Sequence, residues 1–207
     1  MMYTCPSCQN PAADGQTICT ACGFSLEEAD RHLGIPPQLS APVADRHQHL
    51  SASDVRRIAS LTSDIEKQFP QVHLAVAVEH LPPGVPLPVF TFWLFNRAGI
   101  SSSVERGADN HLVLLVIDGG NPRSGGASCM IGYGLEPFVQ KQQLDACLAT
   151  TSTHLTARRH GKAALAFFTA LQTVLQESCL RANQKEQLKD TPTDAPSELV
   201  PTDTSGH

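Results

Sequence analysis

The sequence predicts an α/β domain, in which helices pack over a small mixed sheet, preceded by a small cysteine-bound module. Three observations carry this prediction. Apolar residues recur at helical spacing in several segments, and strand-length apolar runs lie between these segments. One run, residues 112–117, is apolar on both faces, which is typical of a central strand covered on both sides. Four cysteines stand within the first 22 residues.

The four cysteines form two Cys-x-x-Cys pairs, Cys5 with Cys8 and Cys19 with Cys22. Each pair places two thiolates on one tight turn, and two facing turns make a tetrahedral sulfur cage that suits Zn²⁺. Ordering such a segment costs on the order of 25–50 kcal/mol, which its few apolar residues cannot offset. A structural zinc contributes roughly 10–16 kcal/mol. We expect a zinc-bound head over residues 1–26; disulfides, free thiols and an iron cage are the alternatives.

These turns resemble the zinc-ribbon family, whose metal-binding turns often run Cys-Pro-x-Cys-Gly and Cys-x-x-Cys-Gly. Gly23 matches the second turn, where a positive φ directs backbone N–H groups toward sulfur. Gln9 stands where the first turn often has glycine. The resemblance implies a scaffold and names no activity.

Composition and charge limit the cellular compartment and the kinds of partner that we expect for this chain. The chain has 207 residues, a net charge of −5 and seven cysteines, an odd number that cannot all pair as disulfides. No signal peptide and no apolar run near the ~20 residues of a membrane span are visible, which indicates a cytoplasmic location. The head has no Lys or Arg before Arg31, and phosphate binding depends on such cations. We therefore expect protein partners, no nucleic acid and no transmembrane segment.

Residues 27–50 are expected to be a linker, because they contain several prolines and no sustained period. Within this segment, His47 and His49 flank a single residue and could bind a metal. A solvated linker is the favoured interpretation of the pair.

The α/β domain is expected over residues 51–181. Ser51 or Ser53 caps its first helix, and Pro70 ends that helix. The aromatic segment 88–97 has strand propensity, but Pro88 and apolar residues at i, i+3, i+4 and i+7 favour a helix. The remaining expected elements are strands at 72–78, 112–117 and 129–133, a helix from Pro137 to about 153, and a last helix with Ala164, Phe168, Leu171 and Leu175 on one stripe.

A glycine-rich turn over residues 118–126 separates the last two strands, which are therefore expected to form a hairpin. Beyond the last helix, residues 182–207 contain several prolines and mostly acidic charge. Such a composition predicts a disordered acidic tail.

Four short motifs stand in the order of a known family: Arg97-Ala-Gly-Ile, Asp109-Asn110, Gly132-Tyr-Gly-Leu-Glu136 and Gly161-Lys-Ala-Ala-Leu. Together they make residues 51–181 similar to the TPM domain of thylakoid-lumen, photosystem-repair and many membrane-associated bacterial proteins. The resemblance implies a three-layer α/β sandwich. It implies divalent-cation binding and phosphatase activity in some members, and non-catalytic assembly or repair of membrane proteins in others.

The chain departs from the family pattern at three points. The Asp-Arg pair that commonly follows the central strand is Asp118-Gly119 here, and Gln140 or Lys141 stands where an Asp often follows Glu136. The signal peptide and membrane helix usual in the family are not visible. The first two departures weaken a family-type cation site, and the third argues against a lumenal or periplasmic role.

The candidate oxygen ligands for Ca²⁺ or Mg²⁺ are Asp109, Asn110, Asp118 and Glu136. Each stands at a strand end or a helix start, and such termini could converge on one rim of the sheet. Each also has an ordinary explanation, as a turn residue or an acid at a helix N-terminus. Asp118 is also the candidate nucleophile of a phosphatase, with Arg97 or Arg123 pairing with phosphate.

The expected function is that of a non-catalytic interaction or scaffold protein, associated peripherally with a membrane complex. A divalent-cation-dependent phosphatase that uses the acidic residues is the alternative. Cys129 lies in an apolar strand, where a thiol is expected to be inert.

Overall fold

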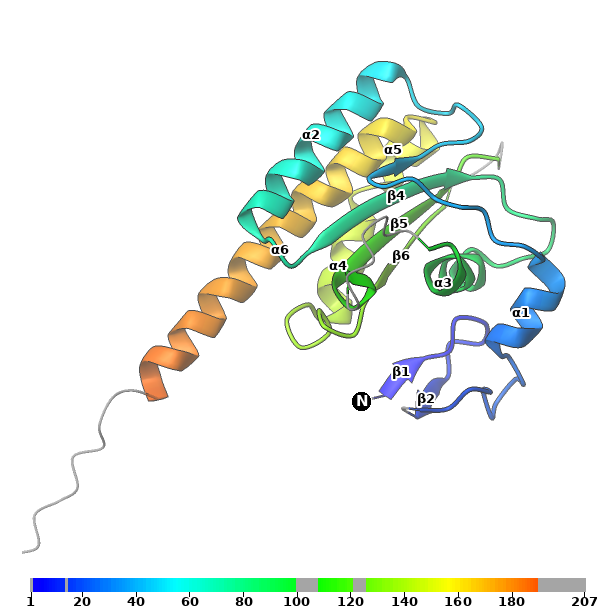
Figure 1. Ribbon diagram of the computed structural model, residues 1–207, viewed down its shortest axis with the longest axis horizontal. Coiled ribbons are helices and arrows are strands. Elements are labelled where there is room, and N and C mark those ends of the chain that lie inside the picture. The colour runs from blue at the N-terminus through cyan, green and yellow to red at the C-terminus, as the bar shows by residue number, and fades with distance from the viewer. Residues whose placement is uncertain (1, 14, 100–107, 121–125, 190–207) are drawn as a thin grey trace, which may run out of the picture.

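A four-stranded sheet lies between two layers of helices in the computed structural model, which describes residues 2–13, 15–99, 108–120 and 126–189 (Figure 1). The strands are β3 (Val43–Ala44), β4 (His73–Glu79), β5 (Leu112–Asp118) and β6 (Ala127–Ile131), paired in that order. The first three run parallel, and β6 runs antiparallel to β5. The expected α/β fold, with a small mixed sheet flanked by helices, is confirmed, as is the hairpin of the last two strands.

The alternation of side chains along β4 and β5 divides the core in two. On one face, Val76 and Leu115 belong to a buried cluster shared with four helices. On the other face, Ala77 and Leu114 belong to a cluster shared with two helices. The first layer is α2 (Ala52–Gln68), α4 (Lys141–Ala149), α5 (Ser152–Thr156) and α6 (His160–Lys189); the second is α1 (Leu26–Leu33) and α3 (Leu87–Arg97). The expected three layers are therefore present.

Helix α2 begins at a side-chain cap. The Ser51 Oγ accepts a hydrogen bond from the Asp54 backbone N–H at 3.1 Å, which satisfies one of the free donors of the first turn. Ser51→Ala should lower the free energy of unfolding by about 1 kcal/mol. Ser60→Ala, at an exposed position of the same helix, is the matched control and should change it by less than about 0.5 kcal/mol. Urea unfolding of both variants measures the difference; equal effects would contradict the capping role.

Two sequence predictions about helices are confirmed. The aromatic segment is helix α3, which begins with a proline in its first turn. In α6, the predicted stripe is buried: Ala164, Phe168 and Leu171 have no exposed area, and Leu175 is 4% exposed.

The segment expected as a linker instead contains regular structure. Helix α1 starts where the Ser25 Oγ accepts from the Glu28 backbone N–H, and it ends at Gly34, whose φ is +77°. Strand β3 joins the sheet by pairing with β4. The linker prediction is wrong on this point because a capping serine and a terminal glycine outweigh the weak apolar period of so short a helix.

Two helix boundaries also differ from the prediction. The helix expected from Pro137 begins only at Lys141, because a turn covers residues 133–138 and Gln140 provides the N-cap. It ends at Ala149, and α5 follows as a separate element. Helix α6 continues to Lys189, so the first part of the expected disordered tail is helical. Residues 190–207 lie outside the described residues.

Helix α6 is the one described helix that is long and apolar enough, between His160 and Ala182, to cross a membrane by length and composition. This is weak evidence, since the core helix of a globular domain passes the same test. Here the apolar stripe of α6 packs on the sheet in the core cluster.

Candidate metal centre

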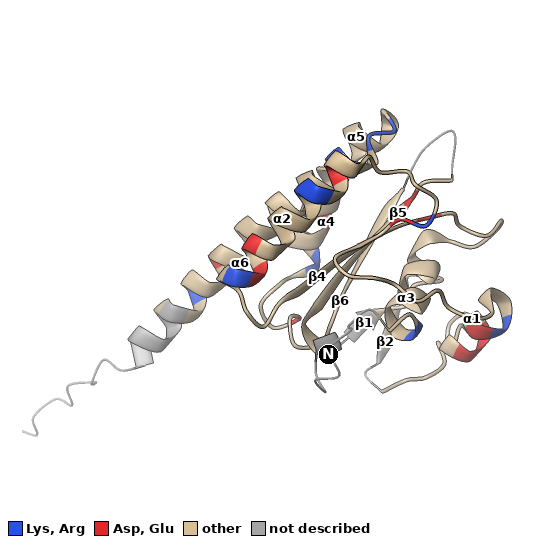
Figure 2. Cartoon of the chain, turned by 45° about the horizontal axis from the view of Figure 1, so that its top comes forward, with Lys and Arg blue, Asp and Glu red and all other residues tan. Residues whose placement is uncertain are grey.

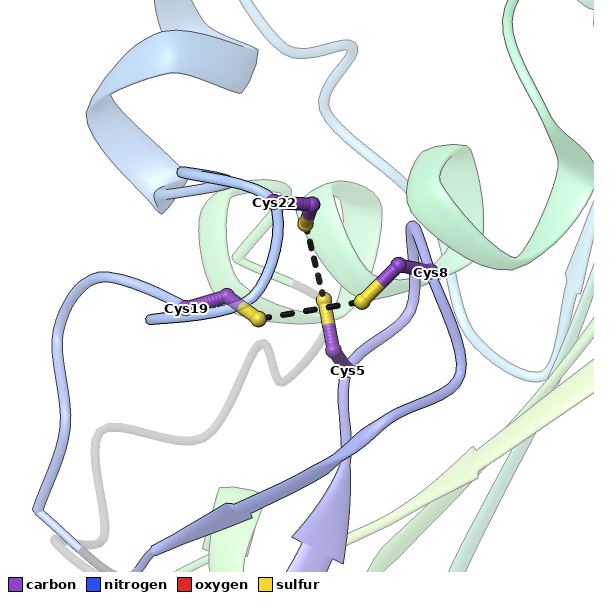
Figure 3. Close-up of side chains that lie close together, drawn as sticks. All are labelled: Cys5, Cys8, Cys19 and Cys22. Carbon is purple, nitrogen blue, oxygen red and sulfur yellow. Dashed lines mark hydrogen bonds between the residues drawn. The ribbon is translucent and has the colours of Figure 1, made fainter.

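The cysteine module is built from a hairpin and a second turn. Strands β1 (Met2–Thr4) and β2 (Pro11–Ala13) pair antiparallel, and the loop between them carries Cys5 and Cys8. Cys19 and Cys22 lie on a turn that an isolated bridge between Ile18 and Ser25 closes. The two turns face each other, so that all four side chains point into one space (Figure 3).

The four sulfur atoms have the spacing of a metal cage. All lie within 4.8 Å of one another, and the Sγ atoms are 3.8 Å apart in both closest pairs, Cys5 with Cys22 and Cys8 with Cys19 (Figure 3). In a tetrahedral site with Zn–S bonds of about 2.3 Å, the sulfurs are about 3.8 Å apart. A disulfide requires about 2.05 Å, so these are free thiols. The arrangement can hold a metal ion such as zinc.

The two metal-binding turns share one backbone geometry. The Gln9 N–H donates to the Cys5 carbonyl at 2.9 Å, and the Gly23 N–H donates to the Cys19 carbonyl at 2.8 Å. Both donors have positive φ, +64° for Gln9 and +76° for Gly23. Gln9 therefore adopts the conformation that glycine provides more easily, and its departure from the zinc-ribbon pattern leaves the turn intact.

Two of the thiols have shifted acidities. Burial raises the pKa of Cys5 to about 11. Hydrogen bonds from the backbone N–H groups of Ala21 and Cys22 lower the pKa of Cys19 to about 7. Because a metal binds the thiolate form, its uptake releases protons and is weakened by acid.

The cysteine module packs against the α/β domain. The rings of Phe24 and Phe92 meet edge to face, with centroids 5.8 Å apart. On α1, Asp30 accepts a hydrogen bond from the Trp93 Nε1 at 3.0 Å and from the Arg97 Nη2 at 2.7 Å. Figure 2 shows that α1 carries charges of both signs. Helix α1 therefore joins the module to α3.

Hydrogen bonds from Arg97 hold the pKa of Asp30 below its ordinary value. A lowered carboxyl pKa contributes stability above the ordinary Asp pKa, and this contribution is lost as the pH falls through the lowered value. The contact between α1 and α3 is therefore favoured at neutral pH.

A cleft of about 320 Å³ lies between the cysteine module and α3. Its lining includes the apolar side chains of Ile18, Phe24, Leu26 and Phe92. Ile18 is 57% exposed there, so the cleft presents apolar surface to solvent.

The structure does not bring the four predicted oxygen ligands to one rim. Asp118 ends β5, beside Glu79 at the end of β4. Asn110 precedes β5 at the opposite end of the sheet, where its carbonyl accepts from the Gly134 N–H at 2.7 Å in the turn that also contains Glu136. A seven-residue strand spans roughly 20 Å, which separates Asp118 from the others.

The remaining candidates for chemistry also lie apart. Asp109 belongs to the 3-10 helix Ala108–His111, and its side chain lies outside the described residues. Arg97 is paired with Asp30, and Arg123 lies outside the described residues. Burial raises the pKa of the Cys129 thiol, in line with an inert group.

Four histidines gather at the carboxyl edge of the parallel strands, and sequence reasoning did not bring them together: His47, His49, His80 and His160. The rings of His47 and His80 stack with centroids 3.9 Å apart, and the rings of His49 and His160 meet edge to face at 5.4 Å. Burial lowers the pKa of both His49 and His160. The visible signals were the His47-Gln-His49 spacing and a histidine directly after β4.

Comparison with solved structures supports the fold alone. The N-terminal domain of a protein from P. gingivalis, solved by NMR, is similar with a TM-score of 0.52 and 23% identity, covering 66% of this chain and 82% of that one. The N-terminal domain of the cg2496 protein from Corynebacterium glutamicum gives a TM-score of 0.49 and 15% identity, covering 80% and 89%. No family model and no curated protein matches the chain. The TPM resemblance therefore stays a prediction.

Proposed function

We propose that this chain is a non-catalytic interaction protein, in which a zinc ribbon and a TPM-like α/β domain present one composite surface to a protein partner. The observation that carries the proposal is the apolar cleft between the ribbon and α3. Its walls come from two parts of the chain that are far apart in sequence.

The contacts around this cleft support a single rigid surface. Asp30 ties α1 to α3 through two hydrogen-bond donors of α3, and Phe24 packs on Phe92. An apolar surface with a polar rim is the usual anatomy of a protein-binding site. The rim here includes Glu27 and Arg97.

Zinc is the proposed metal because four thiolates at tetrahedral spacing suit it best. In this role it would hold the ribbon wall of the cleft in place and take no part in a reaction. The resemblance to TPM domains further suggests a partner within a membrane-protein complex, met by a cytoplasmic chain at the membrane surface.

The test is a paired substitution of two exposed isoleucines. Ile18→Glu places a charge in the cleft and should abolish partner capture from lysate of the source cells, measured by quantitative mass spectrometry. Ile35→Glu makes the same change at a position that is 95% exposed and does not line the cleft, and it should retain the partner. Zinc content, measured in both variants, confirms that the ribbon is intact.

Equal capture by the two variants would show that the cleft does not bind the partner.

The alternative function, a phosphatase, is favoured by one observation, the position of Asp118 beside His80 in a pocket at the edge of the sheet. Phosphomonoester turnover that requires a divalent cation and is lost in Asp118→Asn would replace the interaction proposal by a phosphatase.

A further inference from the structure

We propose that His49 and His80 form a second metal site, which binds a divalent ion of the zinc, nickel or copper class through their two Nε2 atoms. The site lies at the carboxyl edge of strands β3, β4 and β5. It shares no residue with the cysteine cluster and does not depend on the proposed interaction function.

The two ring nitrogens already face each other. The Nε2 atoms of His49 and His80 are 2.7 Å apart. Two imidazole nitrogens on one ion, each about 2.0–2.1 Å from it, lie about 2.8–3.4 Å apart for bond angles between about 90° and 109°. Without metal this contact is a hydrogen bond between the two rings. An ion would replace the shared proton, and the rings would rotate so that both lone pairs point at the ion and would move apart by a few tenths of an ångström. His80 is exposed and His49 is half-buried, so small ring movements are available.

The backbone that carries the two histidines is held on both sides. The Asp45 carboxylate accepts from the backbone N–H of His49 at 2.9 Å and from that of Leu50 at 2.6 Å. Next to it, Arg46 donates two hydrogen bonds to Glu79, the last residue of β4, at 2.9 and 3.2 Å. His80 follows Glu79 directly, so this ion pair connects the loop of His49 to the base of His80.

The end of β5 leaves room for both rings. A Cβ atom at Gly119 would lie 2.6 Å from the Cδ2 of His49, and one at Gly120 would lie 3.1 Å from the Cδ2 of His80. The first distance is far below a normal van der Waals contact. Two consecutive glycines therefore allow the strand end to approach the imidazoles closely, which any larger side chain at Gly119 would prevent.

Neighbouring groups define the chemistry of the site. The ring of His47 stacks on that of His80 within 1° of parallel, and His160 packs against His49. Asp118 and His80 line a pocket of about 390 Å³ beside the site, which has room for water molecules. Imidazole donors select zinc, nickel or copper over Mg²⁺ or Ca²⁺.

The experiment uses full-length protein without a histidine tag, purified with zinc in the cysteine site. Titration with Ni²⁺ in a calorimeter should show about one additional ion per chain, and Cu²⁺ should give an electron paramagnetic resonance spectrum with coupling to two nitrogens. His49→Ala and His80→Ala should each weaken the affinity by about 100-fold or more, since even loss of an outer partner costs about 10–100-fold.

Two controls separate this site from the rest of the chain. His32→Ala removes an exposed histidine of α1 and should leave Ni²⁺ binding unchanged. Cys179→Ser, which changes an exposed cysteine and keeps all four residues of the cysteine cluster, should also leave it unchanged. Absence of saturable Ni²⁺ binding, or equal binding by wild type and both His49 and His80 variants, would overturn the proposal. Thermal unfolding of each variant verifies that the fold is retained.

Discussion

Removal of the zinc ion proposed for the cysteine cluster should unfold residues 2–25 and leave the α/β domain folded. In this stretch, among the residues whose side chains the structure describes, only Cys5, Ala12 and Cys19 are buried. Two of these three belong to the cysteine cluster, so the module has almost no apolar core of its own. A structural zinc contributes roughly 10–16 kcal/mol, which is the largest stabilising contribution available to it.

Amide NMR during titration with a chelator measures this effect residue by residue. Signals of the two Cys-x-x-Cys turns should move to random-coil positions, while those of β4 and β5 persist. Cys19→Ser should give the same spectrum without chelator. Cys179→Ser, which changes an exposed cysteine of α6, is the control and should bind zinc normally. An ordered cysteine module in metal-free protein would show that packing against α3 suffices and that the metal is dispensable.

Arg46→Ala should destabilise the protein by about 3 kcal/mol, because it leaves a buried carboxylate without its cation. The Glu79 side chain is 1% exposed, and Arg46 holds both of its oxygens. The expected value lies at the lower end for a buried pair, since the Arg46 side chain is itself 54% exposed. The His47 Nε2 lies 3.7 Å from the Glu79 Oε2.

A double variant distinguishes the buried charge from lost packing. Arg46→Ala with Glu79→Gln removes the carboxylate charge, and most of the lost free energy of unfolding should return. Arg57→Ala, at an exposed position of α2, is the control and should stay within about 0.5 kcal/mol of wild type. Chemical denaturation measures the free energy of unfolding of wild type and of the three variants. If the double variant is no more stable than Arg46→Ala, the buried charge is not the cause.

The parts of the fold that sequence predicts well are those governed by local chemistry. Ser51 caps α2. In α3, a proline in the first turn indicates a helix, although the aromatic residues of the segment favour a strand. Each Cys-x-x-Cys pair needs only one local turn to bring its two thiols together, so the sequence alone indicates the cysteine cluster. Helix α1 had equally local signals, Ser25 before Glu28 and Gly34 after the last turn, and was recoverable from them.

Long-range placement could not be predicted in the same way. The separation of Asn110 from Asp118 is an exception, because they stand before and at the end of one strand, β5, whose length alone places them at opposite ends of the sheet. Strand β3 has two residues, too few to show any period. His49 lies beside His80 because β3 and β4 are parallel neighbours in the sheet. Neither strand's own sequence indicates which strand it pairs with. Sequence therefore identifies the cysteine ligands and misses the histidine cluster.

Helix α6 is a long, straight extension of the α/β domain. Its 30 residues make an axis of about 45 Å, and its far end projects well beyond the sheet (Figure 1). Its first residue, His160, lies against His49. The length of this helix therefore sets the distance between the histidines and Lys189, the last residue of α6.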